Sequence, residues 1–305
     1  MSTFTWLSSI ALGATILPVL NAEPHCPGNA ASVRLRLDQR SQIIVPVSIN
    51  HTGPYDFLVD TGAQVTTIDP ALVDELHLRI EGTTGFVGVG LRTRPPFAHL
   101  AILEAGSHAI ENPLVIVQNL EQLQAADPHI RGILGGNFLR HFDILIDYAH
   151  SILCLDSEKV MQPEIKGKHI ALATPTRLDD PSLSTEPLII SVRLSGIPGR
   201  PLLELLDSGT NVPLLYDCGK DMAGGFSVRA PIHDRSPDGV ERVFAVLPPQ
   251  DMQISTLTLH QVSFVTPAAA GKDVPKLGVD GLLPTALFRR IYISYADRFV
   301  VLEPW

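Results

Sequence analysis

The sequence predicts an all-β protein made of two related lobes. Short runs rich in valine, isoleucine and leucine alternate with turn residues along most of the chain. The 25 prolines and 23 glycines suit many short strands better than long helices. In addition, segments of the first half recur in the second half in the same order. The first two observations predict the β class, and the third predicts the two lobes.

Size and composition are those of a folded globular protein. A chain of 305 residues is long enough for two domains of ordinary size. Hydrophobic residues make up 45% and charged residues 18%, unlike the composition of a disordered chain. The net charge of −9, without any long run of lysine or arginine, argues against nucleic acid or an anionic membrane as a partner. We therefore expect the mature chain to bind neither.

The expected strands of the first half are short and separated by turn signals such as the segment 50–54. Two short helices are expected at 70–76, where Asp69 could cap the first turn, and at 137–141. Strands are expected at 33–37, 43–49, 55–59, 114–117, 144–147 and 152–155.

The internal repeat is aligned by placing Asp60 over Asp207, an offset of 207 − 60 = 147 residues. A period this long excludes a solenoid and indicates a duplicated lobe. Small changes of offset between the matching segments can be absorbed in loops. The further matches are Tyr148 with Tyr295, 132–134 with 281–283, and 43–49 with 188–194.

The two lobes are expected at residues 30–156 and 164–305. Between about residue 156 and residue 186 the chain is polar and contains several prolines. We interpret this stretch as the connection between the lobes, together with the first strand of the second lobe at 170–173.

The N-terminus has the pattern of a secretory signal peptide. Residues 6–20 are apolar or small and uncharged, and Ala22 ends a tripeptide that resembles a cleavage site. Residues 1–22 are therefore interpreted as a signal peptide, which predicts a secreted or periplasmic protein. The alternative is an uncleaved segment that anchors the chain in the membrane.

Three cysteines follow the signal segment: Cys26, Cys154 and Cys218. Because the number is odd, at most one disulfide can form within the chain. A bond between Cys26 and Cys154 is one possibility, and isolated buried or free thiols are the other. No cysteine has the spacing of a metal ligand, so we expect no metal site.

Two short motifs occupy matching places in the two copies. Each motif directly follows an apolar strand. About 70 residues after each motif comes a glycine with two apolar residues, at 132–134 and 281–283. One such tripeptide alone is often an ordinary turn. Agreement in strand, motif and apolar run in both copies indicates a paired site. The motifs are Asp60-Thr61-Gly62-Ala63 and Asp207-Ser208-Gly209-Thr210.

With these motifs the chain resembles the clan AA aspartic peptidases, which include the two-lobed pepsin-like enzymes and the bacterial retropepsin-like ones. The runs 132–139 and 280–283 also carry the resemblance, which covers most of the chain after about residue 30. It implies two β-barrel lobes with the active site in the cleft between them. It further implies a peptide or protein substrate, no metal and no cofactor. A monomer would suffice, because one chain supplies both aspartates.

The resemblance also implies roles for individual residues. Asp60 and Asp207 would be the catalytic pair. The hydroxyls of Thr61 and Ser208 would hydrogen-bond the opposite loop and hold the two aspartates together. The residues packed beside the catalytic loops would be Ile133, Leu134, Gly135, Leu282 and Leu283.

The chemistry explains why two aspartates are needed. Two carboxyl groups about 3 Å apart cannot both ionise, so they share one proton. The ionised member can accept a proton from a bound water, and the protonated member can donate one to the carbonyl oxygen of the scissile amide. Both loops must turn sharply at the lobe interface, which Gly62 and Gly209 permit.

The residue after each glycine differs between the copies. The hydroxyl of Thr210 could hydrogen-bond a carboxylate and favour its ionised form, whereas Ala63 has no hydroxyl. We therefore predict a mildly acidic activity optimum, and a maximum below about pH 3 would contradict this.

A glycine-rich segment downstream of the first motif is expected to form the flap that closes over the substrate. Its residues are Phe86, Gly88 and Gly90. A plain hairpin is the alternative. A phosphate loop is excluded, because no Lys-Ser/Thr pair and no helix start follow it. In the second copy the turn 237–239 lies in a position that could correspond.

Three alternatives to a single-chain enzyme are open. Only the first lobe could be competent, so that Asp60 pairs with Asp60 of a second chain, as in retropepsins. The chain could be a secreted binding module that kept the fold and lost activity. Pro284 favours this reading, because it stands where the first copy has Gly135 and removes a backbone donor. Finally, it could be a β-rich envelope protein with coincidental motifs.

Overall fold

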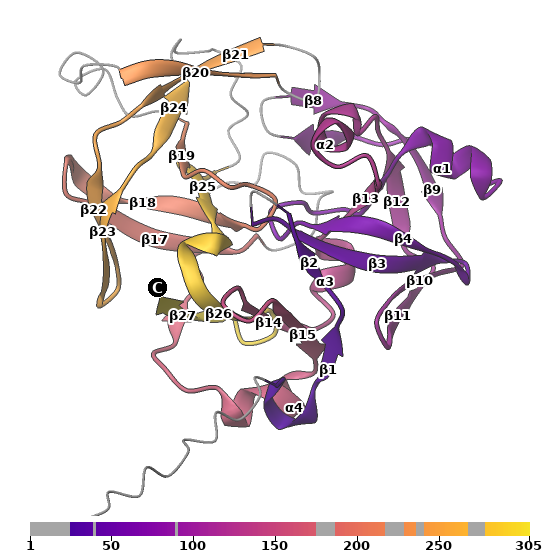
Figure 1. The fold of residues 1–305 in the computed structure, drawn as a ribbon, viewed down its shortest axis with the longest axis horizontal. Helices are drawn as coiled ribbons and strands as arrows, with labels where there is room; N and C mark the ends of the chain where they lie inside the picture. Colours follow the sequence, from indigo (N-terminus) through magenta and orange to yellow (C-terminus); the bar gives the residue numbers. More distant parts are fainter. Residues whose placement is uncertain are drawn as a thin grey trace, which may run out of the picture.

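The computed structural model shows two β lobes that flank a shared sheet (Figure 1). It describes residues 25–38, 41–88, 91–174, 187–216, 229–235, 241–267 and 278–305. The expected signal segment 1–22, Cys218, Gly90 and the turn 237–239 lie outside these residues. The predicted all-β, two-lobed fold is confirmed.

The first lobe is a curled sheet. Its strands are β2 (Arg36–Leu37), β3 (Ile43–Ile49), β4 (Thr52–Val59), β5 (Thr67–Ile68), β6 (Gly82–Thr83), β9 (Pro96–His99), β10 (Ile102–Ala105), β11 (His108–Glu111), β12 (Leu114–Val117) and β13 (Ile130–Leu134). Their order is β11-β10-β3-β4-β13-β5-β12-β9-β6, with β2 paired to β3. A separate hairpin consists of β7 (Phe86–Gly88) and β8 (Leu91–Thr93).

The second lobe is built in the same way. Its strands are β17 (Ile189–Leu194), β18 (Ile197–Asp207), β19 (Leu214–Leu215), β20 (Arg229–Arg235), β21 (Glu241–Val246), β22 (Gln250–Ile254), β23 (Leu257–Val262), β24 (Val265–Pro267) and β25 (Gly281–Pro284). Their order is β20-β21-β24-β19-β25-β18-β17-β22-β23.

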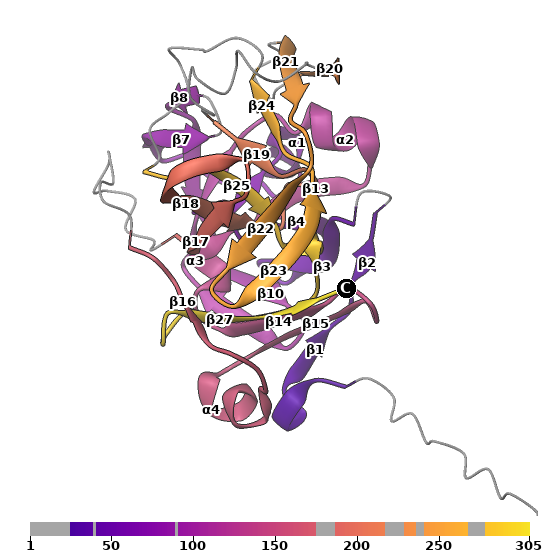
Figure 2. The same cartoon turned by 90° about the vertical axis from the view of Figure 1, so that its left-hand side faces the viewer.

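Strands from both lobes form the third, shared sheet. They are β1 (Ala31–Val33), β14 (Asp143–Asp147), β15 (Ile152–Asp156), β16 (Ile170–Ala171), β26 (Phe288–Ser294) and β27 (Phe299–Pro304). In the order β1-β15-β14-β26-β27-β16, the central pair β14–β26 joins the two lobes. Both views place this sheet beneath the lobes, at the end opposite β8 and β20–β21 (Figures 1 and 2).

Helices are short and few within the described residues. They are α1 (Pro70–Glu75), α2 (Glu121–Ala126), α3 (Gly136–Leu139) and α4 (Glu158–Met161), with 3-10 turns η1 (Pro27–Asn29), η2 (Gln162–Glu164) and η3 (Thr285–Leu287). The expected cap of α1 is present, because Asp69 accepts a hydrogen bond from the Leu72 amide at 2.7 Å. None of the helices in this part of the chain is long and apolar enough to span a membrane.

Most expected strands are confirmed within a few residues, but one expectation is wrong in detail. The segment 33–37 is not one strand. Its first part, in β1, pairs with β15 in the shared sheet, whereas β2 pairs with β3 in the first lobe. The segment 170–173 begins with β16, which pairs with β27 in the shared sheet, and Ala173 forms a bridge with Ile189 at the start of the second lobe's own sheet. In the segment 33–37 a change of sheet divides the expected strand.

The repeat is visible in the strand register. In the first lobe β4 pairs with β13 in parallel, with Leu58 opposite Ile133. In the second lobe β18 pairs with β25 in parallel, with Leu205 opposite Leu282. The two pairs are related by the offsets of 147 and 149 found in the sequence, so each aspartate follows the same kind of central, buried strand.

A disulfide joins Cys26 to Cys154 and ties the N-terminal segment to β15. Both cysteines are buried, in a cluster beneath the shared sheet. Of the two possibilities left open by the sequence, the bonded pair is therefore the one found.

This bond should stabilise the fold, because it closes a loop with a sequence separation of 128 residues. Replacing Cys26 and Cys154 together by alanine is expected to lower the free energy of unfolding by about 2–5 kcal/mol. Urea unfolding of both proteins, with and without reductant, measures this. Reductant should weaken the wild type alone, and equal midpoints for the two oxidised proteins would contradict the prediction.

Candidate active site

The two aspartates end matching strands at the interface between the lobes. Asp60 follows β4 directly, and its amide donates to the Leu134 carbonyl of β13 at 3.1 Å. Asp207 is the last residue of β18 and lies opposite Pro284 of β25. Apolar residues anchor both strands in the lobes' cores, and this burial fixes where each carboxyl group emerges.

Each carboxylate is held by its own loop in the same way. Oδ1 of Asp60 accepts hydrogen bonds from the amides of Gly62 at 2.8 Å and Ala63 at 2.9 Å. Oδ1 of Asp207 accepts from the amides of Gly209 at 2.7 Å and Thr210 at 3.1 Å. The second copy therefore keeps both amide hydrogen bonds to its carboxylate, and we call this pair of bonds the carboxylate cradle.

Both glycines are required by close approach across the interface. A Cβ atom on Gly62 would lie 2.7 Å from Cγ of Asp207, and one on Gly209 would lie 2.7 Å from Cγ of Asp60. Any larger residue at either place would push the aspartates apart. The structure thus brings Asp60 and Asp207 into one site made by a single chain.

Thr61 and Ser208 interlock the two loops. The Thr61 hydroxyl donates to the Leu206 carbonyl at 2.9 Å and accepts from the Ser208 amide at 3.0 Å. The Ser208 hydroxyl donates to the Val59 carbonyl at 2.7 Å and accepts from the Thr61 amide at 3.0 Å. All four bonds are buried and all cross between the lobes, which is the arrangement that the resemblance implies.

Ser208→Ala should therefore weaken the lobe interface measurably. It removes two of the four bonds and leaves the Thr61 amide and the Val59 carbonyl buried without partners, at about 1–3 kcal/mol each. We expect the free energy of unfolding to fall by at least about 2 kcal/mol in urea titrations. Ser191→Ala, on an exposed position of β17, is the matched control and should change little. Equal losses in both variants would refute the interlock.

Burial raises the pKa of both aspartates. For Asp207 the rise is large, because burial acts together with the negative charge of Asp60. For Asp60 burial also raises the pKa, while hydrogen bonds from the Ala63 amide, Asp207 and the Gly62 amide oppose it. Because both pKa values are raised and the two groups interact, the pair holds a shared proton over part of the pH range.

One expectation about this pair is wrong. The Thr210 hydroxyl does not bind the carboxylate; it donates to the Val212 carbonyl at 3.3 Å. The loop turns the hydroxyl away, and only the Thr210 amide reaches Asp207. The difference between Ala63 and Thr210 therefore does not set the protonation of the pair. Burial is the largest cause of the raised pKa of both aspartates.

The apolar runs lie beside the loops. Leu134 and Leu283 are fully buried, and Ile133 and Leu282 occupy matching positions on β13 and β25. The copies differ at the next residue. The first copy has Gly135, whose amide donates to the Thr66 hydroxyl at 3.2 Å. The second copy has Pro284, which has no amide hydrogen to donate and directly precedes the turn η3.

The expected flap is partly described. Phe86 and Gly88 lie in β7, which pairs with β8 as a two-stranded hairpin, and Gly90 lies outside the described residues. Figures 1 and 2 show the hairpin at the end of the first lobe that faces away from the shared sheet. No three histidine, cysteine, aspartate or glutamate side chains in the described residues are grouped to hold a metal.

Residues 45–138, which include β4, the Asp60 loop and α3, match the model of the aspartyl protease family. This match lies within the first lobe. A similar solved structure is a retropepsin-like aspartic protease from Rickettsia conorii, at 17% identity and a TM-score of 0.32; the alignment covers 42% of this chain and 92% of that one. No curated protein matches the chain.

Two further parts of this site could not be singled out from the sequence. Gln42 donates from Nε2 to the Gly209 carbonyl at 2.5 Å and so supports the second loop from the first lobe. Tyr148 and Tyr295 are the other part: burial raises the pKa of each tyrosine, and the charge of Asp207 adds to this for Tyr148 and that of Asp60 for Tyr295. The repeat had paired these tyrosines, and this was the available signal.

Glu204 is the other residue that sequence reasoning missed. It is fully buried on β18, and both of its carboxyl oxygens lack a hydrogen-bond partner among the described residues. Burial, with a contribution from the charge of Asp280, raises its pKa well above the usual range. Its counterpart on β4 is Phe57, so a carboxyl group occupies an aromatic core position.

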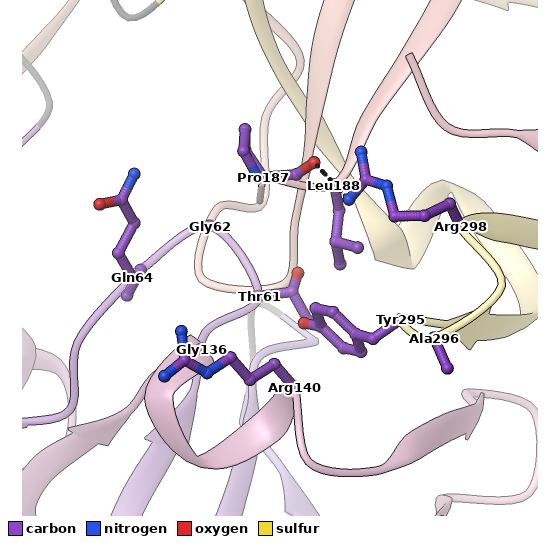
Figure 3. Close-up of a pocket in the computed structure, with 11 residues that line it drawn as sticks. Thr61, Gly62, Gln64, Gly136, Arg140, Pro187, Leu188, Tyr295, Ala296 and Arg298 are labelled. Atoms are coloured by element: carbon purple, nitrogen blue, oxygen red, sulfur yellow. Dashed lines mark hydrogen bonds between the residues drawn. The ribbon is translucent and has the colours of Figure 1, made fainter. Parts of the chain in front are cut away.

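A pocket of about 250 Å³ adjoins the loop that follows Asp60 (Figure 3). The first lobe contributes the loop after Asp60 and the region of α3, and the second lobe contributes the two residues before β17 and the β26–β27 turn. The lining residues are Thr61, Gly62, Ala63, Gln64, Gly136, Arg140, Pro187, Leu188, Tyr295, Ala296 and Arg298. The pocket therefore lies between the lobes, beside the aspartates rather than over them.

Proposed function

We propose that the protein is an aspartic endopeptidase that hydrolyses peptide bonds with a water activated between Asp60 and Asp207 of one chain. The observation that carries the proposal is the pairing of the two carboxyl groups. Each is held by loop amides, the glycine of each loop lies against the opposite carboxyl group, and Thr61 and Ser208 hydrogen-bond across the interface.

In the proposed reaction, ionised Asp60 accepts a proton from the water while the water oxygen attacks the carbonyl carbon of the substrate. Asp207 donates its proton to the carbonyl oxygen, which gives a neutral tetrahedral diol. Collapse of the diol breaks the carbon–nitrogen bond, and the proton held by Asp60 passes to the leaving amine. No covalent bond to the protein forms, and the shared proton returns to the pair.

Two features support the single-chain site over a dimer of first lobes. The position opposite Asp60 is taken by Asp207 and the Gly209 backbone of the same chain. The interlocking hydroxyls are also satisfied within the chain. Pro284 favours an inactive binding module, but its effect is limited, because the cradle of Asp207 is complete despite it.

We infer export to an oxidising compartment, secreted or periplasmic. The signal pattern of residues 1–22 motivates this, and the Cys26–Cys154 bond supports it, because disulfides persist mainly outside the reducing cytosol. The alternative is that the same segment stays uncleaved and anchors the chain in the membrane. N-terminal sequencing of the exported protein distinguishes the two, because only a cleaved signal peptide gives a new N-terminus after Ala22.

The test is cleavage of a mixed peptide library by the purified protein between pH 3 and 7, read by mass spectrometry. We expect cleavage with a mildly acidic optimum, because the raised pKa of Asp207 keeps the shared proton on the pair to higher pH. Activity should fall as the pH rises through that pKa and both carboxyls ionise. Absence of any cleavage across this range would favour the binding module.

A further inference from the structure

A carboxyl group is buried between the central strands of the second lobe. It belongs to Glu204 on β18, the strand that ends in Asp207, and its side chain is fully buried. Neither of its carboxyl oxygens has a hydrogen-bond partner in the described part of the chain. On one side β17 places Ile190 opposite Glu204, and on the other side β25 places Gly281 opposite it. Neither neighbour has a polar side chain that could satisfy the carboxyl group.

The glycine of the apolar run makes room for this carboxyl group. A Cβ atom on Gly281 would lie 2.6 Å from Oε2 of Glu204. The matching glycine of the first lobe is Gly132, where a Cβ atom would lie 2.2 Å from Cε1 of Phe57. Both copies therefore keep the same space between the same two strands. The first copy fills it with an aromatic ring, and the second fills it with a carboxyl group.

The neighbours of this space also differ between the copies. The residue before the glycine is Arg131 in the first lobe and Asp280 in the second. The Arg131 carbonyl accepts from the Asp69 amide at 3.0 Å, and its side chain pairs with the Asp69 carboxylate at 2.6 Å. The Asp280 carbonyl accepts from the Tyr216 amide at 2.8 Å. In the second lobe an acid thus takes the place of the cation.

The charges around Glu204 oppose its ionisation. Burial raises its pKa well above the usual range, and the charge of Asp280 adds to this. Asp280 itself is bound by both Nη atoms of Arg200, at 2.6 and 2.7 Å. The Tyr216 hydroxyl is buried and without a partner among the described residues, and burial raises its pKa, with further contributions from the charges of Asp207 and Glu204. The titratable groups around Glu204 in this part of the chain are therefore acids and a phenol.

We propose that Glu204 is a switch that keeps the second lobe closed in acid and lets it open toward neutral pH. β18 ends in Asp207, and β25 lies beside it with Pro284 opposite Asp207. Separation of these two strands therefore removes one member of the aspartate pair from the interface between the lobes. The consequence for activity rests on the proposed peptidase function, whereas the opening itself does not.

The direction of the switch follows from proton linkage. When the strand pair opens, water reaches Glu204 and its pKa returns to the ordinary value of a glutamate, about 4.3. The closed state binds the proton more tightly, so the stability that it gains is complete below that pH. Above it, the open state gains about tenfold in relative population per pH unit, until the pH reaches the raised pKa of the closed state.

Hydrogen exchange measured by mass spectrometry tests the switch without any substrate. Protection factors, which correct for the intrinsic effect of pH on exchange, are followed for β18 and β25 between pH 4.5 and 7.5. We expect them to fall with pH in the wild type by about tenfold per pH unit more than in Glu204→Gln, whose side chain cannot ionise. Glu204→Leu, which suits an apolar core, is the second variant and should behave like Glu204→Gln. The exposed Glu111→Gln is the matched control and should behave like the wild type.

Activity measures the consequence for the catalytic site. Both Glu204 variants should stay active to higher pH than the wild type and Glu111→Gln, and an unchanged alkaline limb would overturn the control of activity. If no peptide is cleaved but the protection of β18 and β25 depends on pH through Glu204, the switch is supported and the peptidase is overturned. Equal pH dependence of protection in the wild type and both Glu204 variants would overturn the switch, whether or not peptides are cleaved.

Discussion

Asp60→Asn and Asp207→Asn are each expected to lower kcat for peptide hydrolysis by about 10²–10⁴-fold, the usual contribution of a positioned acid or base. Asparagine is nearly isosteric and can still accept the loop amides' hydrogen bonds at Asp60 and Asp207. The variants should therefore fold normally and lose only the proton transfers. Steady-state kinetics on one cleaved peptide, with the unfolding midpoint as the folding check, provides the measurement.

Asp74→Asn is the matched control for this prediction, because Asp74 is exposed on α1 and remote from the loops. It should retain full activity. If Asp207→Asn were as active as the wild type while Asp60→Asn was inactive, the enzyme would be a dimer of first lobes. Full activity of both would remove the dyad from the mechanism altogether.

The second large effect concerns stability and involves Glu204. Its folded-state pKa is raised above the unfolded value, so the folded state holds the proton more tightly. This stabilising contribution is complete below the unfolded pKa of a glutamate. It is lost as the pH rises through the folded-state pKa, because the ionised carboxylate has no partner.

Glu204→Leu should therefore become progressively more stable than the wild type as the pH rises, by about 1–3 kcal/mol near neutral pH. The difference should shrink toward acidic pH, where Glu204 is protonated in both states. Urea unfolding at a series of pH values measures it, with the exposed Glu111→Leu as the control. A variant that shows the same dependence on pH as the wild type would show that Glu204 is solvated or paired.

Much of the fold could be predicted because duplication leaves a record in the chain. The strand before each aspartate and the apolar run after it recur at nearly fixed offsets, and the paired strands of the structure follow the same register. Local signals also sufficed for α1, where Asp69 caps the helix before a proline.

Other features depend on contacts that no local pattern encodes. The division of 33–37 between two sheets follows from where β15 and β3 lie, and this is settled only by tertiary packing. The hydroxyl of Thr210 was expected at the carboxylate because of its place in the sequence. Its loop directs it to Val212 instead.

The candidate site shows the same limit. Asp60 and Asp207 could be named from the motifs. Glu204 could not, because a single glutamate in an otherwise apolar strand gives no sign in the sequence that its side chain is buried. The pocket could not be predicted either, because its lining residues come from segments of both lobes that only the tertiary structure brings together.

The central claim is that one chain forms one complete dyad. Its most direct test is a calorimetric titration of the purified protein with a peptide that carries a tetrahedral hydroxyl-bearing carbon in place of the scissile carbonyl, since such mimics bind far more tightly than substrates. Light scattering gives the oligomeric state in the same buffer. We predict one equivalent bound per chain, with tight binding lost in Asp207→Asn. Half an equivalent per chain, or unchanged binding by Asp207→Asn, would contradict the account.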